Sequence, residues 1–175
     1  MEERLEVKGK KNPMREIKIE KVVLSIGGTG DYLSKGHKLL ELITKRKPSK
    51  KTSRKRIPSW GVRPGLEIGT AVTIRKDAED LLKKMLIAIE NRLKETQVSE
   101  NNFSFGIHEY IEIPGMEYHR EIGIMGLDVT VVFKRAGRRV RLKKIKKGKI
   151  PKRQVITREE IISFMENKFG TRFIK

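Results

Sequence analysis

Two stretches of this 175-residue chain are too basic to fold into a core, and they constrain where everything else can go. Residues 45–63 contain nine Lys or Arg side chains and no acidic one, and residues 134–153 contain twelve and again no acidic one. Charged side chains are almost never buried unless they are paired. Both segments must therefore lie at the surface, and we expect them to face an anionic partner.

The net charge of +19 is concentrated in these two segments. Outside them, the 20 remaining basic residues are balanced by all 22 acidic residues. A nearly neutral domain with two cationic segments is typical of a nucleic-acid-binding protein, because neutralising phosphates releases counterions and favours association. The alternative, that a charge run is only solvated surface, explains one run more readily than two in one small domain.

Length and composition indicate a soluble, intracellular protein with a single core. The chain has no Cys, so disulfides and thiolate metal sites are excluded. No apolar run approaches the ~18 residues of a membrane span, and the charged N-terminus lacks the apolar centre of a secretory signal. We expect a polar lead-in at residues 1–14, one domain at 15–175, no cofactor and no membrane partner.

Hydrophobic periodicity predicts the element order β-α-β-β-α-β-β-α. Strands are expected at residues 15–26, 50–56, 66–75, 103–113 and 127–133, and helices at 34–46, 77–96 and 157–170. Asp77 is the predicted cap of the second helix, and Thr157 with Glu160 forms a predicted capping box for the last one. The glycines at positions 27, 28 and 30 indicate a tight strand-to-helix turn, since the spacing of a phosphate-binding loop is absent.

The first six elements match the split β-α-β arrangement of a ferredoxin-like sheet. We therefore predict an α+β fold: an antiparallel sheet with helices on one face, basic loops and a C-terminal helix. Such a fold leaves one sheet face and its loops free for RNA. The fold alone does not assign the function.

Other functional classes find little support in the residues. His108 and Glu109 head a group of acids and histidines that could supply acid and base groups, but no nucleophile, phosphate loop or metal spacing accompanies them. DNA binding through a recognition helix is not favoured, because the basic residues fall in extended segments. An RNA-recognition motif is not favoured either, since the strand GTAVTIR lacks base-stacking aromatics.

Five stretches carry a resemblance to a known family and occur in that family's order. They are NPMREIKIEKVVLSIG, LLELITKRKPSKKTSRK, GVRPGLEIGTAVTIR, FGIHEYIEIPGMEY and GIMGLDVTVVFKRAGRRV, which together span residues 12–140. In these stretches the chain resembles the large-subunit ribosomal protein number five, in its archaeal and eukaryotic form.

The resemblance implies a structural protein of the cytoplasmic large ribosomal subunit and no enzyme. It implies binding to 5S ribosomal RNA and to large-subunit ribosomal RNA in the central protuberance. It also implies a loop that contacts the peptidyl-site transfer RNA, and contact with a small-subunit protein across the subunit interface. The alternatives are a generic binder of structured RNA outside the ribosome and, more remotely, an enzyme that uses His108 and Glu109.

The resemblance and the two charge runs nominate the contact residues. The expected ribosomal RNA contacts in the first half are Ser25, Arg46, Lys47, Lys50, Lys51, Thr52, Arg54, Lys55, Thr73 and Arg75. Those in the second basic segment are Arg138, Arg139, Arg141 and Lys143. The expected transfer RNA loop is Arg56, Ile57, Pro58, Ser59, Trp60, Gly61, Val62 and Arg63. No metal or catalytic residue is expected.

Three of these positions keep two interpretations. Ser25 stands where the family often has Asn, and Arg46 stands where many members have Gln. Each can still hydrogen-bond, but Arg46 can also hold a phosphate and Ser25 can be a small strand residue without a contact. Trp60 either folds onto the domain as an amphipathic anchor or stacks on RNA.

Overall fold

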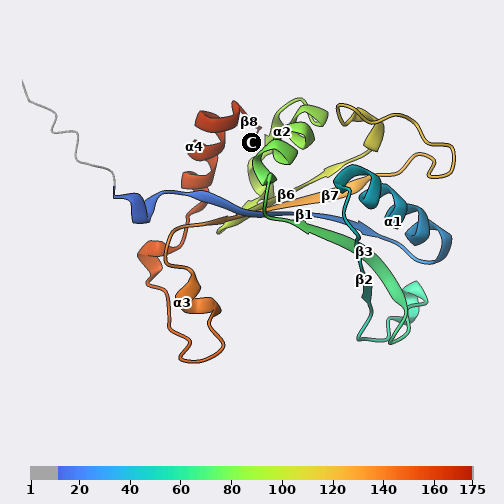
Figure 1. Cartoon of the computed structure of the whole chain (residues 1–175), viewed down its shortest axis with the longest axis horizontal. Coiled ribbons are helices and arrows are strands. Elements are labelled where there is room, and N and C mark those ends of the chain that lie inside the picture. Colours follow the sequence, from blue (N-terminus) through green and yellow to red (C-terminus); the bar gives the residue numbers. More distant parts are fainter. Residues whose placement is uncertain (1–11, 175) are drawn as a thin grey trace, which may run out of the picture.

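A six-stranded sheet with the order β2-β3-β1-β7-β6-β5 carries the fold in the computed structural model, which describes residues 12–174 (Figure 1). Each neighbouring pair in this sheet is antiparallel, and β4 and β8 form a separate parallel pair. The strands are β1 Lys18–Gly27, β2 Ser49–Thr52, β3 Glu67–Ile74, β4 Arg92–Lys94, β5 Val98–Ser99, β6 Asn102–Ile107, β7 Leu127–Lys134 and β8 Arg172–Ile174.

The strand directions confirm the predicted split β-α-β fold. Strands β1 and β2 run parallel with β3 between them, and α1 (Gly30–Thr44) connects them. The fourth strand of the motif is β7, which pairs with β1 along most of its length. The sequence-based assignment of residues 103–113 to that place is wrong, because β6 forms an antiparallel pair with β7 and extends the sheet beyond the motif.

Strict alternation along β1 separates a core face from an open face. Val22, Leu24 and Ile26 are at most 3% exposed, while the residues between them are half-buried. The helices α1, α2 (Ala78–Ala88) and α4 (Arg158–Phe169) cover the core face, and the short α3 (Arg139–Leu142) lies on the other side (Figure 1). The buried side chains of the neighbouring elements include Val72, Ile74, Phe103, Phe105, Val129, Val131, Phe133, Leu39, Leu40, Leu82, Met85 and Ile161.

Two predicted elements are shorter than expected because the chain turns early. Helix α2 ends at Ala88 rather than near residue 96, since Glu90 and Asn91 adopt positive φ and redirect the chain into β4. Strand β6 ends at Ile107 rather than at 113. The chain packs closely at this end, since a Cβ at Gly126 would lie 2.8 Å from the carbonyl oxygens of Ile107 and His108.

The ends of the helices test the predicted caps. Helix α1 begins at Gly30, earlier than predicted, and Gly30 takes a φ of +61° at the strand-to-helix turn. Asp77 precedes α2, but it has a left-handed backbone and makes no side-chain cap, so that prediction is wrong. The capping box of α4 is confirmed, since the Thr157 N–H donates to the Glu160 carboxylate at 3.0 Å.

The remaining expectations concern the chain ends and the first basic segment. Of the predicted lead-in, residues 1–11 lie outside the described residues, and Pro13–Arg15 forms a 3-10 turn whose Met14 N–H donates to Asn12. The strand expected at 50–56 is confined to β2. Within residues 12–174, no helix is long and apolar enough to cross a bilayer.

An ion pair ties the second basic segment to α4. The Arg135 side chain is only 8% exposed, and its Nη2 donates to Glu160 Oε1 at 2.6 Å. Its Nη1 donates to the Arg153 carbonyl at 2.9 Å. Burial raises the pKa of Glu160, but the hydrogen bond from Thr157 and the guanidinium of Arg135 outweigh it and leave that pKa below the ordinary 4.5.

We predict that Glu160→Gln lowers the free energy of unfolding by about 1–2 kcal/mol at pH 7, because a charged hydrogen bond to a buried Arg is weakened at a site that is partly open to solvent. A lowered pKa in the folded state makes this contribution complete above the unfolded value of 4.5 and lost as the pH falls through the folded value. The unfolding temperatures of the variant and of wild type should therefore differ at pH 7 and converge in acid.

Glu159→Gln is the matched control, since Glu159 is exposed in the same helical turn. A stability difference for Glu160→Gln that stays constant from pH 7 into acid would contradict the role given to the ion pair.

Candidate nucleic-acid interface

The open face of the sheet presents small and polar side chains in the region of β1 and β3. Ser25 pairs with Ala71 of β3, and Thr73 pairs with Val23 of β1. Because paired residues share a face, Ser25 and Thr73 lie diagonally across the same surface. Both are half-buried rather than covered by a helix, and Arg75 follows at the exposed end of β3. The structure thus brings together three of the predicted RNA contacts.

Strand β2 adds positive charge along the edge of this face. Register pairs Ser49 with Ala71 and Lys51 with Gly69, so both share the face of Ser25. Lys50 pairs with the buried Thr70 and so starts from the other face, and its Nζ lies 2.8 Å from Glu67 at the start of β3. Both partners of that ion pair are about half exposed, so the pair contributes at most ~1 kcal/mol and a phosphate can replace the carboxylate.

The C-terminus of α1 sets the position of Arg46 and Lys47. Lys45 closes the helix in the left-handed conformation, with its N–H bonded to the Glu41 carbonyl at 2.7 Å. The next N–H, that of Arg46, donates to Thr44 Oγ1 at 3.3 Å, and Pro48 is buried. Arg46 and Lys47 remain exposed next to the negative end of the helix dipole, where cations are favoured.

The loop after β2 is a hydrogen-bonded hairpin. Ser53 is buried, its backbone N–H donates to the Leu66 carbonyl at 2.8 Å, and its Oγ donates to the Lys55 carbonyl at 2.7 Å. Further out, Ile57 and Val62 bond each other in both directions at 2.9 and 3.0 Å. We call residues 49–66, from β2 to the end of this loop, the edge arm.

Trp60 lies at the turn of this hairpin and is 78% exposed. It therefore does not fold onto the domain, which removes the anchor interpretation. Val62 is 6% exposed, so it holds the hairpin from inside instead of presenting a contact. The other predicted loop residues are exposed apart from the half-buried Ile57; they are Arg56, Pro58, Ser59, Gly61 and Arg63, and the RNA candidates Thr52, Arg54 and Lys55 are exposed as well.

The second basic segment forms another projection, residues 135–153, which we call the α3 arm. Arg138 at its root forms an ion pair with Glu20 and donates to the Phe133 carbonyl at 3.1 Å. Its guanidinium thus serves the fold rather than standing free, unlike the exposed Arg139, Arg141 and Lys143. Sequence patterns could not predict the ion pairs of Arg138 and Arg135, because their partners lie 118 and 25 residues away.

The two arms stand at opposite ends of β1 and project to the side of the sheet away from α1, α2 and α4 (Figure 1). Lys18 pairs with Lys134 at one end of β1, and Gly27 pairs with Gly69 at the other. Nine residues of strand separate these rows by about 30 Å. The open face therefore lies between two cationic arms, and Asp128 is an exposed acid on this face.

The opposite side of the molecule has different chemistry. Residues 108–126 follow β6 and contain His108, Glu109 and His119, all exposed. Among residues 12–174, no group of three His, Asp or Glu side chains is arranged to hold a metal ion. Lys38 of α1 reaches Glu121 at 3.0 Å, which places this acidic segment beside the helical layer.

Comparison with known proteins finds two family models that match this chain. A family model described as "Ribosomal protein L5" matches residues 12–63, and one described as "ribosomal L5P family C-terminus" matches residues 67–164. The boundary between them falls where the edge arm returns to β3.

Three relatives illustrate the similarity, each carrying the name "Large ribosomal subunit protein uL5". The protein from Nanoarchaeum equitans is 41% identical over 93% of this chain and 99% of its own length. Those from Pyrobaculum aerophilum and Sulfolobus acidocaldarius are 42% and 40% identical, over 94% and 95% of this chain and 93% and 96% of their own lengths. With both family models matched in order, the chain belongs to the ribosomal L5 protein family.

Proposed function

We propose that this protein is a structural constituent of the large ribosomal subunit that binds 5S ribosomal RNA and large-subunit ribosomal RNA in the central protuberance. The observation that carries the proposal is the open face of the sheet between two cationic arms. Membership of the ribosomal L5 family supports the ribosomal setting. No chemical step is required of such a protein, and its work is to hold RNA in place.

The arms and the open face contact different parts of the RNA. Exposed Lys and Arg side chains of the arms contact phosphates, which fixes orientation without reading sequence. Ser25 and Thr73 on the open face have hydroxyls that can donate hydrogen bonds to, and accept them from, ribose 2′-hydroxyls or base edges. The about 30 Å between the arms favours recognition of a folded RNA surface over a short linear sequence.

The tip of the edge arm is our proposed contact to the peptidyl-site transfer RNA. Trp60 is a large, 78% exposed aromatic on a hairpin that backbone hydrogen bonds hold in shape. An exposed indole next to Arg56 and Arg63 suits stacking on a base or ribose beside a phosphate chain. The rigid root of the arm then allows 5S RNA and transfer RNA to be held by neighbouring parts of one projection.

The segment 108–126 suits a protein partner across the subunit interface. It carries the exposed acids Glu109, Glu112, Glu117 and Glu121, and its exposed apolar side chains include Ile111, Tyr118 and Ile124. Carboxylates repel RNA, whereas an acidic surface with apolar side chains complements a basic protein. We propose a small-subunit protein as this partner.

The alternative function is that of a generic binder of structured RNA outside the ribosome, since cationic arms attract any polyanion. Competition between 5S RNA and an unrelated structured RNA of equal length separates the two functions. Preference for 5S RNA at moderate salt supports the ribosomal role, and equal affinity supports the generic one.

Salt dependence of 5S RNA binding should distinguish the roles of two arginines in the α3 arm. We predict that Arg141→Gln reduces the slope of log affinity against log salt by about 0.7–0.9, the value of one phosphate contact, and leaves thermal stability unchanged. Arg138→Gln should instead lower the unfolding temperature, because it leaves Glu20 without its partner.

Lys84→Gln on α2 is the matched control for lost charge, since Lys84 is exposed on the helical side. Binding of 5S RNA that does not depend on salt would overturn the electrostatic account. Equal slope changes for Arg141→Gln and Lys84→Gln would show that the α3 arm makes no phosphate contact of its own.

Trp60→Ala should leave 5S RNA affinity within about twofold of wild type and weaken transfer RNA contact on the assembled subunit, because a stacked base contributes ~1–3 kcal/mol. Trp60→Phe should retain most of that contact. Footprinting of transfer RNA on subunits reconstituted with each variant measures the effect. If Trp60→Ala by itself abolished 5S RNA binding, that would contradict the proposal that the tip of the edge arm contacts transfer RNA and the rest of it contacts 5S RNA.

A further inference from the structure

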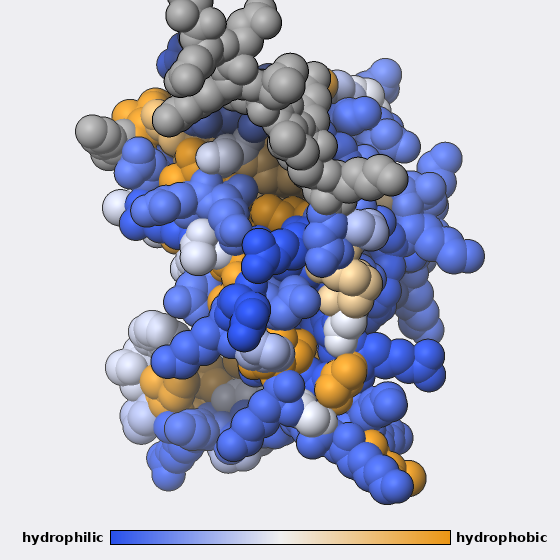
Figure 2. Space-filling model, turned by 90° about the vertical axis from the view of Figure 1, so that its left-hand side faces the viewer, coloured by the Kyte–Doolittle hydropathy of each residue, from blue (hydrophilic) through white to orange (hydrophobic). Residues whose placement is uncertain are grey.

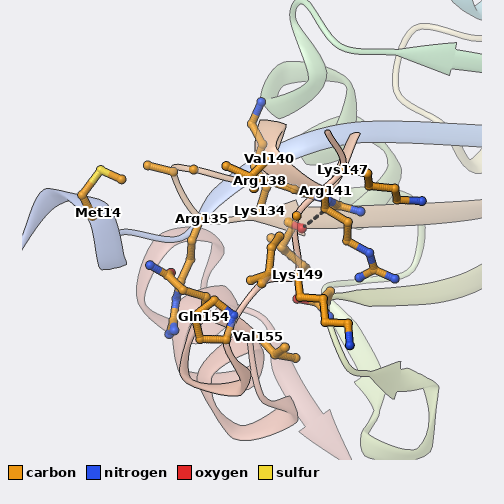
Figure 3. A pocket seen from close by; sticks show the side chains of 17 residues that line it. Met14, Lys134, Arg135, Arg138, Val140, Arg141, Lys147, Lys149, Gln154 and Val155 are labelled. Carbon is orange, nitrogen blue, oxygen red and sulfur yellow. Dashed lines mark hydrogen bonds between the residues drawn. The ribbon is translucent and has the colours of Figure 1, made fainter. Parts of the chain in front are cut away.

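A hollow of about 710 Å³ lies at the root of the α3 arm, apart from the open face and the edge arm. Its walls come from the arm, the end of β7, the segment that leads to α4, and Met14. The apolar side chains of the lining that the argument uses are Met14, Val140, Ile150 and Val155. Figure 3 shows Met14 on one side of the hollow and Arg141, Lys147 and Lys149 on the other.

The charge of the hollow is strongly positive. Its lining contains six Lys or Arg residues and no acidic residue. Arg135 and Arg138 are paired with Glu160 and Glu20, outside the lining. The other four are Lys134, Arg141, Lys147 and Lys149, which have no acidic partner among residues 12–174. An anionic ligand is the occupant that this charge favours.

The hollow also has apolar walls, which phosphate binding alone does not require. Met14 and Val140 are both more than two-fifths exposed, and Ile150 and Val155 are half-buried beside them. Hydrophobic surface is visible between hydrophilic side chains at this end of the molecule (Figure 2). A cationic rim around an apolar interior fits a ligand with an anionic part and a flat, weakly polar part.

Internal contacts form the hollow without a ligand. The Gly148 N–H donates to the Val140 carbonyl at 3.2 Å and closes the arm on itself. A Cβ at Gly148 would lie 2.6 Å from Val140 Cγ1, so glycine permits this closure. On the far wall, Arg135 holds the Arg153 carbonyl at 2.9 Å. The cavity is therefore largely preformed, as small-ligand sites usually are.

We infer that this hollow binds one unpaired nucleotide of a structured RNA, with the base against Met14, Val140 and Val155. The adjoining phosphates lie against Arg141, Lys147 and Lys149. Its volume falls within the ~300–1,000 Å³ of small-ligand sites, and proteins that recognise RNA commonly take unstacked bases from bulges and loops. An acidic peptide would satisfy the rim but has no flat group to fill the apolar walls. The inference rests on the proposed RNA-binding function and adds a nucleotide site to it.

The absence of Cys from the chain allows a direct test. Ala136→Cys places a single thiol on the lining of the hollow, and Ile87→Cys places one on α2, where Ile87 is 55% exposed on the helical side. The rate of alkylation of each full-length variant is measured alone, with an RNA hairpin that carries a one-nucleotide bulge, and with the same hairpin fully paired. Both RNAs are used at about ten times their dissociation constants, so that roughly one tenth of the protein stays free.

We expect the bulged hairpin to slow alkylation of Ala136→Cys by about tenfold, as that occupancy implies, and the paired hairpin to slow it much less. Alkylation of Ile87→Cys should respond to neither. Equal protection of Ala136→Cys by both hairpins would overturn the inference, since only the duplex would then be recognised. Protection by polyglutamate equal to that by the bulged hairpin would also overturn it, in favour of an acidic peptide.

Two further outcomes are distinguishable. A thiol in Ala136→Cys that resists alkylation without RNA, but reacts once residues 1–11 are removed, would show that the chain's own N-terminal segment fills the hollow, which overturns the inference. If the Ala136→Cys variant binds 5S RNA without protection of its thiol, only the nucleotide site fails. If wild type binds neither 5S RNA nor either hairpin, the proposed function fails with it.

Discussion

The environment of β1, with one face covered by helices and both edges paired with strands, is the constraint on which the rest of the structure depends. On one side of this strand Val22, Leu24 and Ile26 are buried under the helices, while β3 and β7 pair with its two edges. From Val22 to Ser25 its backbone therefore has no free hydrogen-bonding edge, and its second face can stay uncovered without exposing core. Ser25 and Thr73 belong to that face because an alternating strand has nowhere else to put them. The same strand fixes the arms, since each is rooted near one of its ends.

Carrying 17 positive charges on two arms would destabilise a small domain if the arms were close together. With roots about 30 Å apart along β1, they are separated by several times the ~8 Å Debye length at physiological ionic strength. Repulsion between the arms is therefore largely screened, and what remains acts within each arm. The α3 arm reduces it by pairing Arg135 with Glu160 and Arg138 with Glu20. These two acids belong to α4 and β1, so the arm itself contains no carboxylate side chain.

The sequence was sufficient for the fold class because long alternating and helical patterns dominate this chain. The runs around Val22, Val72 and Val129 each commit one face to the core, and the structure follows them. It was insufficient where conformation depends on particular turns. Nothing in the helical spacing of Leu93 reveals that Glu90 and Asn91 will end α2 first, nor does the alternation through Ile113 reveal that Tyr110 is buried in a turn. The hollow was missed for a similar reason, since Met14 and Val155 meet only after folding.

The separation of charge between the two sides of the sheet gives the molecule a direction. On the open side, cationic arms stand around small hydroxyl and glycine residues; on the helical side, residues 108–126 present carboxylates with exposed apolar groups. An RNA that approached residues 108–126 would meet carboxylates, and a basic protein that approached the open side would meet the arms. Because the sheet holds these surfaces apart, the cationic and the acidic surface face different directions. A flexible basic tail of the same charge would attract RNA equally well but would not orient it.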